Sequence, residues 1–144
     1  MAAAQAMNPG QYAAKEGASG QYEIRSSRLV LATSRNAGLR RFATEMVRDH
    51  TQSTADVKRA AMQANGVAGP LRLDAIGTRN IAQSTRARRP ERDALYVQPQ
   101  KLAHRMALDL QQGYARRGTV APLRMAATRI VPVVQHHLGE LSRM

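Results

Sequence analysis

The chain has 144 residues, a formal net charge of +12 and no cysteine, and only 3% of its residues are aromatic. This length predicts one domain, and the lack of cysteine excludes disulfides and thiolate metal ligands. No run of about 18 apolar residues occurs, so we expect no transmembrane segment. Abundant alanine with few aromatic residues favours helices over sheets, and the positive charge suits polyanionic partners.

Residues 1–8 are predicted to form a flexible N-terminal segment. Their small apolar side chains are typical of the end of a signal peptide, which residues left over from expression also resemble, and an ordinary flexible terminus is equally consistent. Residues 9–144 are predicted to form a single helical-bundle domain. Its first helix is expected from Pro9 to Ser34, because Asn8 is a good N-cap and proline fits the first helical position.

A second helix is predicted from Leu39 to Asn65, where apolar residues recur at steps of three and four. His50 continues these steps, which places its imidazole on the buried side of the helix. The glycines and the proline between Gly66 and Pro70 are expected to end it. A shorter helix should follow from Leu71 to about Thr85, and residues 86–92 form a basic connector.

Two more long helices are predicted in the C-terminal half of the chain. The first runs from about Glu91 to Arg117, and the second begins between Thr119 and Pro122 and reaches the C-terminus. His104 and His137 lie on their respective apolar stripes, whereas His136 should face water. Each helix therefore contributes one inward imidazole.

Both of these helices contain an internal proline, Pro99 in one and Pro132 in the other. A proline removes one backbone hydrogen bond and costs about 3 kcal/mol in a regular helix. We expect kinks about one turn from the inward histidines, with the carbonyls of Leu95 and Thr128 released. Four long helices and one short helix predict an all-α, ferritin-like four-helix bundle, with the short helix in the long connection between the second and third long helices.

Three sequence strings carry a resemblance to a known family. They are Arg41-Phe-Ala-Thr-Glu-Met-Val-Arg-Asp-His-Thr51, Asp93-Ala-Leu-Tyr-Val97 with His104 eight residues after its tyrosine, and Val131-Pro-Val-Val-Gln-His-His-Leu138 with His137 five residues after its proline. Over roughly residues 20–141 the chain resembles an uncharacterised, ferritin-like family of bacterial exported proteins that often bear the label outer membrane protein.

The resemblance implies a four-helix bundle that is exported to the periplasm or cell envelope, and it implies no established enzymatic activity. The chain departs from the family's motifs at two points. Val131 replaces the usual leucine before the proline, and Pro99 interrupts a segment that is normally unbroken.

Imidazoles and a carboxylate on facing helices are the usual materials of a metal site inside a helical bundle. A site for one divalent ion is therefore predicted from Glu23, His50, His104 and His137. The candidate outer partners, meaning residues that hydrogen-bond to these ligands without touching the ion, are Asp49, Asp93 and Glu140. Zinc suits such a nitrogen-rich set best, while iron, copper and manganese stay open. The alternative is a polar core layer in which the same groups only form hydrogen bonds.

Helix rise tests whether these groups share one level. Counted from the turn at Asn36, Glu23 and His50 are nearly equidistant, so we expect them to be neighbours. Counted from Gly118, His104 and His137 differ in height by about 7 Å. Unless the proline kinks close this offset, the bundle holds two separate polar pairs and no metal.

Two classes of function follow, of which the first is non-catalytic binding or buffering of a divalent metal ion. The second is a polyanion-binding or envelope-structural and stress protein that acts through an arginine-rich surface. Its members are Arg40, Arg41, Arg86, Arg88, Arg89, Arg92, Arg116 and Arg117, and its partner is a polyanion or an anionic envelope component. Few aromatic residues argue against a dedicated nucleic-acid site. A ferritin-like metal oxidase is a weaker alternative, because His137-x-x-Glu140 reverses the Glu-x-x-His order of di-iron bundles.

Overall fold

The computed structural model describes residues 7–64 and 71–144, and all regular structure within these ranges is helical. The helices are α1 (Pro9–Thr33), α2 (Ala37–Gln63), α3 (Ala75–Arg86), α4 (Arg89–Arg117) and α5 (Ala121–Leu141). The all-α prediction is confirmed. Most of the predicted flexible segment, and the glycines and proline predicted to end the second helix, lie outside the described residues.

Polar side chains set where the first three helices begin. Asn8 caps α1 as predicted, by accepting a hydrogen bond from a backbone N–H of the first turn. Asn36 caps α2 in the same way, so this helix begins earlier than its apolar pattern indicated. Asp74 caps α3, which therefore begins at Ala75 and not at Leu71.

α4 and α5 each accommodate a proline inside the helix. Both helices continue without a break, α4 through Pro99 and α5 through Pro132. Neither proline has an N–H to donate, so the carbonyl four residues earlier loses its helical partner. The kinks expected at these positions stay predictions.

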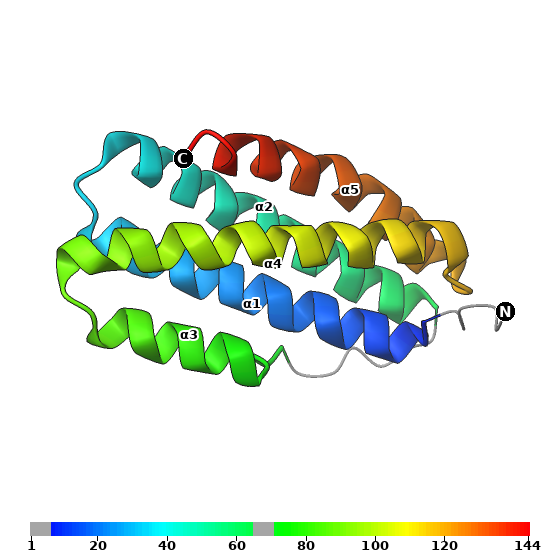
Figure 1. The fold of residues 1–144 in the computed structure, drawn as a ribbon. Coiled ribbons are helices and arrows are strands. Elements are labelled where there is room, and N and C mark those ends of the chain that lie inside the picture. Colours follow the sequence, from blue (N-terminus) through cyan, green and yellow to red (C-terminus); the bar gives the residue numbers. More distant parts are fainter. Residues whose placement is uncertain (1–6, 65–70) are drawn as a thin grey trace, which may run out of the picture.

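The four long helices pack side by side, with α3 on their outer surface (Figure 1). α1 and α2 form one antiparallel pair, and α4 and α5 form another. The pairs join because α1 packs against α4 and α2 packs against α5. α2 and α4 run in the same direction, so the chain must travel back between them, and α3 makes this return alongside α1.

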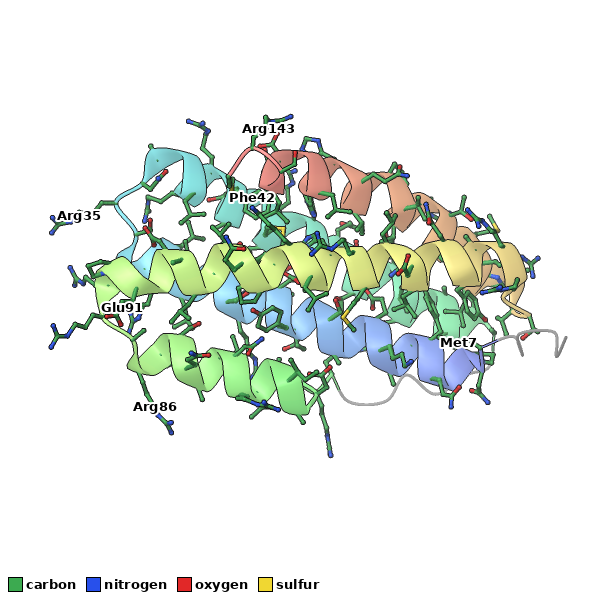
Figure 2. The ribbon with its side chains drawn as sticks, viewed as in Figure 1. Met7, Arg35, Phe42, Arg86, Glu91 and Arg143 are labelled. Carbon is green, nitrogen blue, oxygen red and sulfur yellow. The ribbon has the colours of Figure 1, made fainter. Side chains whose placement is uncertain are left out.

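Two apolar clusters fill the interior. One contains Tyr12, Val57, Tyr114, Leu123, Ile130 and Val134, and the other contains Val30, Phe42, Met46, Tyr96 and Leu141. Phe42 is among the side chains that Figure 2 shows between the helices. Along each of α2, α4 and α5, a histidine falls between residues of the two clusters, and Glu23 does so along α1. A polar layer therefore separates the clusters.

The α1–α2 pair is close-packed at Gly20. A Cβ added at this glycine would lie 2.5 Å from Oγ1 of Thr54. Glycine weakens a helix by about 1 kcal/mol relative to alanine, and here it permits an approach that a larger residue would prevent. This contact lies about one turn before Glu23 and so holds the polar layer of α1 near α2.

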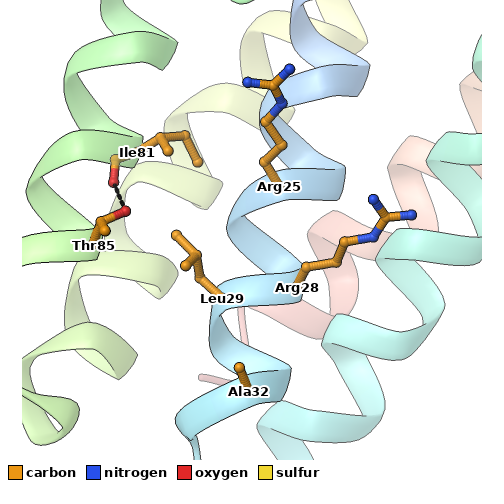
Figure 3. Close-up of a pocket in the computed structure, with 6 residues that line it drawn as sticks. All are labelled: Arg25, Arg28, Leu29, Ala32, Ile81 and Thr85. Carbon is orange, nitrogen blue, oxygen red and sulfur yellow. Dashed lines mark hydrogen bonds between the residues drawn. The ribbon is translucent and has the colours of Figure 1, made fainter.

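The outer surface has a shallow hollow of about 290 Å³ between α1 and α3 (Figure 3). It is lined by Arg25, Arg28, Leu29, Ala32, Ile81 and Thr85. The Thr85 hydroxyl donates to the carbonyl of Ile81 at 2.8 Å, so its hydrogen atom is already used within α3. None of the predicted metal ligands lines this hollow, because they lie in the core of the bundle.

Candidate metal centre

Three buried histidines meet in the polar layer, one each from α2, α4 and α5. The ring centroids are 5.6 Å apart for His50 and His104, 5.4 Å for His50 and His137, and 5.4 Å for His104 and His137. The candidate ligand atoms of all three lie within 4.8 Å of one another. The predicted alternative of two separate polar pairs is therefore wrong.

Helix geometry explains why the predicted 7 Å offset does not separate His104 from His137. Measured from the helix ends at Arg117 and Ala121, their distances along the chain differ by three residues, or about 4.5 Å. Side chains on a helix lean toward its N-terminus. His104 therefore leans away from the α4–α5 connection and His137 leans toward it, which brings the two rings together.

Hydrogen bonds fix the orientation of two of the rings. Nδ1–H of His104 donates to the carbonyl of Gln100 at 2.9 Å, and Nε2–H of His137 donates to Oδ2 of Asp49 at 2.9 Å. Bonds of this kind set the tautomer of metal-ligating histidines. The opposite nitrogens, together with Nε2 of His50, are buried and have no hydrogen-bond partner in residues 7–64 and 71–144. One nitrogen of each ring is thus left for a ligand.

Burial keeps these imidazoles neutral. It lowers the pKa of His104 to about 4, and the neighbouring His137 acts in the same direction. Burial lowers the pKa of His50 well below its ordinary value, and it lowers that of His137 although Asp49 opposes the shift. Neutral imidazole is the form that binds a metal ion, so the rings are in the competent protonation state at neutral pH.

The family described as a domain of unknown function, DUF4142, matches residues 1–144 of the chain. The chain belongs to the DUF4142 family. Neither a curated protein nor a solved structure matches it. Membership of DUF4142 names no activity, so the function must be argued from the histidine site.

In this DUF4142 chain Glu23 lies beside His104, with Oε1 3.9 Å from Nδ1. Burial raises the pKa of Glu23 to about 8, and the Gln100 side chain acts in the opposite direction. Because the carboxyl and the imidazole are both neutral in the metal-free chain, their proximity is not an ion pair. The group of three histidines does not include Glu23, and its predicted pairing with His50 stays a prediction.

Of the three predicted outer partners, Asp49 is the one with a hydrogen bond to a site histidine. Its carboxylate holds Nε2 of His137. Asp93 instead accepts a hydrogen bond from the Ser34 hydroxyl at 3.0 Å, and Glu140 pairs with an arginine three residues later on the surface. Neither of these two carboxylates bonds a histidine among the described residues.

A buried hydrogen-bonded network joins α1 to α4 in this DUF4142 protein and was not predicted. The Gln100 amide donates to the hydroxyl of Ser26 at 3.0 Å, and the hydroxyls of Ser27 and Tyr96 are bonded at 2.7 Å. Gln100 also supplies the carbonyl that orients His104. The sequence signal was a glutamine one helical turn before a histidine on the same apolar stripe.

The arrangement of the three histidines could hold a metal ion. A tetrahedral ion with bonds of 2.0–2.1 Å to nitrogen requires nitrogen–nitrogen separations of about 3.4 Å. Nitrogens within 4.8 Å of one another reach this geometry by side-chain shifts of about 1 Å. A purely hydrogen-bonded polar layer would instead have to pair the three buried nitrogens, and the described residues supply no partner for them.

Proposed function

We propose that this chain is a non-catalytic protein that binds one divalent metal ion through His50, His104 and His137. The observation that carries the proposal is the set of three buried nitrogens that have no hydrogen-bond partner in the described part of the chain, on neutral rings whose ligand atoms lie within 4.8 Å of one another. Three histidines with a fourth position left open suit zinc. Iron, copper and manganese accept the same donors with different preferences for geometry.

Glu23 supplies the negative charge that such an ion needs. Its Oε2 is buried, and no described residue forms a hydrogen bond with it. A nearby dication favours the ionised carboxylate over the neutral acid. Glu23 therefore offsets part of the metal's charge from its place beside His104, and it becomes a fourth ligand when its side chain turns toward the ion.

We further propose a ferritin-like bundle that buffers its metal in the periplasm or cell envelope. The course of α1, α2, α4 and α5, with a long return between the second and third long helices, supports the bundle. The motif resemblance supports the location. A di-iron oxidase needs several carboxylate ligands, and in the described residues the one carboxyl beside the site histidines and completely buried is that of Glu23.

Metal analysis tests the proposal directly. Protein purified without a histidine tag is dialysed against Zn²⁺ or Co²⁺ and analysed for bound metal. We expect about one ion per wild-type chain and none in His50→Ala or His104→Ala. His136→Ala is the matched control, because His136 is exposed and next to a site residue. Equal metal content in all four proteins would disprove the three-histidine site.

A second candidate function, binding of an envelope polyanion, rests on unpaired arginines. Within the described ranges, ion pairs to acidic side chains involve Arg48, Arg59 and Arg143 and no member of the predicted arginine-rich surface. Arg86 of that surface projects from the same end of the molecule as Arg35 (Figure 2). Guanidinium groups that have no acidic partner among the described residues suit a phosphate-bearing polymer.

Salt dependence tests this candidate. Neutralising two or three phosphates releases bound counterions, so the affinity for lipopolysaccharide should fall at least about tenfold between 50 and 200 mM salt. The variant Arg86→Gln/Arg88→Gln/Arg89→Gln should bind more weakly and show a shallower slope. Binding that does not change with salt, or that survives in the triple variant, would assign the arginines to the solvated surface alone.

A further inference from the structure

Three side chains on the α2–α5 face lead from solvent to the buried histidines. Glu45 and Asp49 lie one turn apart on α2 and so share one face of that helix. Nε2 of His136 on α5 lies 3.5 Å from Oε2 of Glu45. The carboxylate of Asp49 bonds Nε2 of His137, whose ring centroid is 5.9 Å from that of His136. These donors form a continuous series across two helices.

Exposure falls steadily along this series. The side chain of His136 is 58% exposed, that of Glu45 is 37%, that of Asp49 is 18% and that of His137 is 0%. Oε2 of Glu45 is itself buried and accepts no hydrogen bond from the residues that the structure describes. A cation that first meets His136 and Glu45 can therefore pass to ligands of increasing burial without leaving oxygen or nitrogen donors.

Electrostatics favours this face for a cation. The chain carries a net charge of +12, so most of its surface repels a hydrated dication. On this face Glu45 and Asp49 place two carboxylates one turn apart on α2. Arg48 occupies Oδ1 of Asp49, whereas Glu45 has no arginine or lysine partner among the described residues.

We propose that Glu45, Asp49 and His136 form the path by which a divalent cation reaches and leaves the three-histidine site. This inference rests on the proposed metal-binding function. Glu45 and His136 capture the hydrated ion, and Asp49 receives it next. The His137 ring then turns about its broad second side-chain torsion, so that its unprotonated Nδ1 takes the ion at Asp49 and carries it inward as the ring turns back, while Nε2 keeps its proton. The ion keeps its charge throughout and no covalent bond changes.

Cobalt binding kinetics test the path. Co²⁺ is mixed with wild-type protein and with Glu45→Gln/His136→Gln in a stopped-flow instrument, and its release is followed after addition of a chelator. Substitutions in an entry and exit path should change the rates of metal association and metal dissociation by the same factor. We therefore expect association and dissociation to slow together by about 10-fold, with the equilibrium Kd unchanged. Glu140→Gln is the control, because it removes the same charge from a partly exposed carboxylate that already pairs with an arginine.

The outcomes separate this inference from the metal site itself. If wild type binds Co²⁺ and the double variant exchanges it at the wild-type rate, the path is wrong and the site stands. If only dissociation accelerates, so that Kd weakens, Glu45 or His136 is a ligand and the path is again wrong. Equal slowing by Glu140→Gln would show a net-charge effect. If wild type binds no Co²⁺, the proposed function and the path both fail.

Discussion

Replacing His50 with leucine should stabilise the metal-free protein. His50 is buried, its Nε2 has no hydrogen-bond partner, and no hydrogen bond to this ring occurs among the described residues. A buried polar group without a partner costs about 1–3 kcal/mol, and leucine has a similar volume without that penalty. Chemical unfolding in the presence of a chelator should therefore show a gain of about 1–3 kcal/mol for His50→Leu.

The same substitution should remove the response to zinc. A ligand that binds only the folded state at 100 times its Kd stabilises that state by about 2.7 kcal/mol. Wild type should show this gain in unfolding free energy when zinc replaces the chelator, and His50→Leu should show none. Met46→Leu is a matched control from the apolar cluster on the same helix, which should keep the zinc response and change stability by less than about 1.5 kcal/mol.

The two interpretations of the polar layer predict opposite signs in this experiment. If His50 belonged to a hydrogen-bonded core layer, its removal would leave a partner unsatisfied and lower the stability. If His50→Leu lowers the stability in the chelator and leaves the zinc response unchanged, the result would support a purely hydrogen-bonded core layer without a metal site. If the variant gains unfolding free energy in the chelator and loses the zinc response, the result supports a metal site. Only in such a site are the buried ligand nitrogens left unpaired in the metal-free protein, which lowers its stability.

Helical spacing was enough to predict the polar layer. Steps of three and four residues identify the inward face of a helix whatever its neighbours do, and they placed His50, His104 and His137 inside. The structure confirms that all three are buried and that the fold is helical. Capping side chains marked the helix starts less reliably, because Asn36 was interpreted only as the turn after the first helix and is the N-cap of α2.

The meeting of the histidines could not be predicted from counting alone. Residue counts give heights along a helix axis, whereas the meeting of two rings depends on the length of the connection and on the lean of each side chain. The sequence offered Asp49 as one of three candidate outer partners, but it could not show which histidine Asp49 would contact. The bond from His137 to Asp49 joins residues 88 positions apart, and no local pattern encodes such a contact.

A second substitution with a large expected effect is Glu16→Gln. Glu16 lies on α1, is 5% exposed and has no basic partner among the described residues. Burial raises its pKa from the ordinary 4.5 to about 7, and repulsion from Asp56 adds to the shift. The folded state therefore prefers the neutral acid at this position.

The sign of the pH effect follows from proton binding. In the unfolded chain Glu16 loses its proton near pH 4.5, while in the folded chain it keeps the proton until about pH 7. Between these values the unfolded state binds fewer protons, so the contribution of Glu16 to stability falls as pH rises and is constant above pH 7. The cost at pH 8.0 amounts to about 3 kcal/mol, because each pKa unit corresponds to 1.36 kcal/mol.

Glutamine resembles the neutral acid and never ionises, so Glu16→Gln should remove this cost. We expect the variant to exceed wild type in unfolding free energy by about 3 kcal/mol at pH 8.0 and by less than about 1 kcal/mol at pH 5.0. Chemical unfolding in a chelator at both pH values measures the difference, and the titration of the histidines cancels because both proteins share them.

Two further variants identify the cause. Asp109→Asn changes an exposed carboxylate on α4 and should leave both stabilities within about 0.5 kcal/mol of wild type. Asp56→Asn removes the repulsion but not the burial, so it should recover a smaller part of the gain than Glu16→Gln, again only at pH 8.0. An identical gain for Glu16→Gln at pH 5.0 and pH 8.0 would mean that side-chain packing, and not the buried charge, limits the stability of α1 at this position.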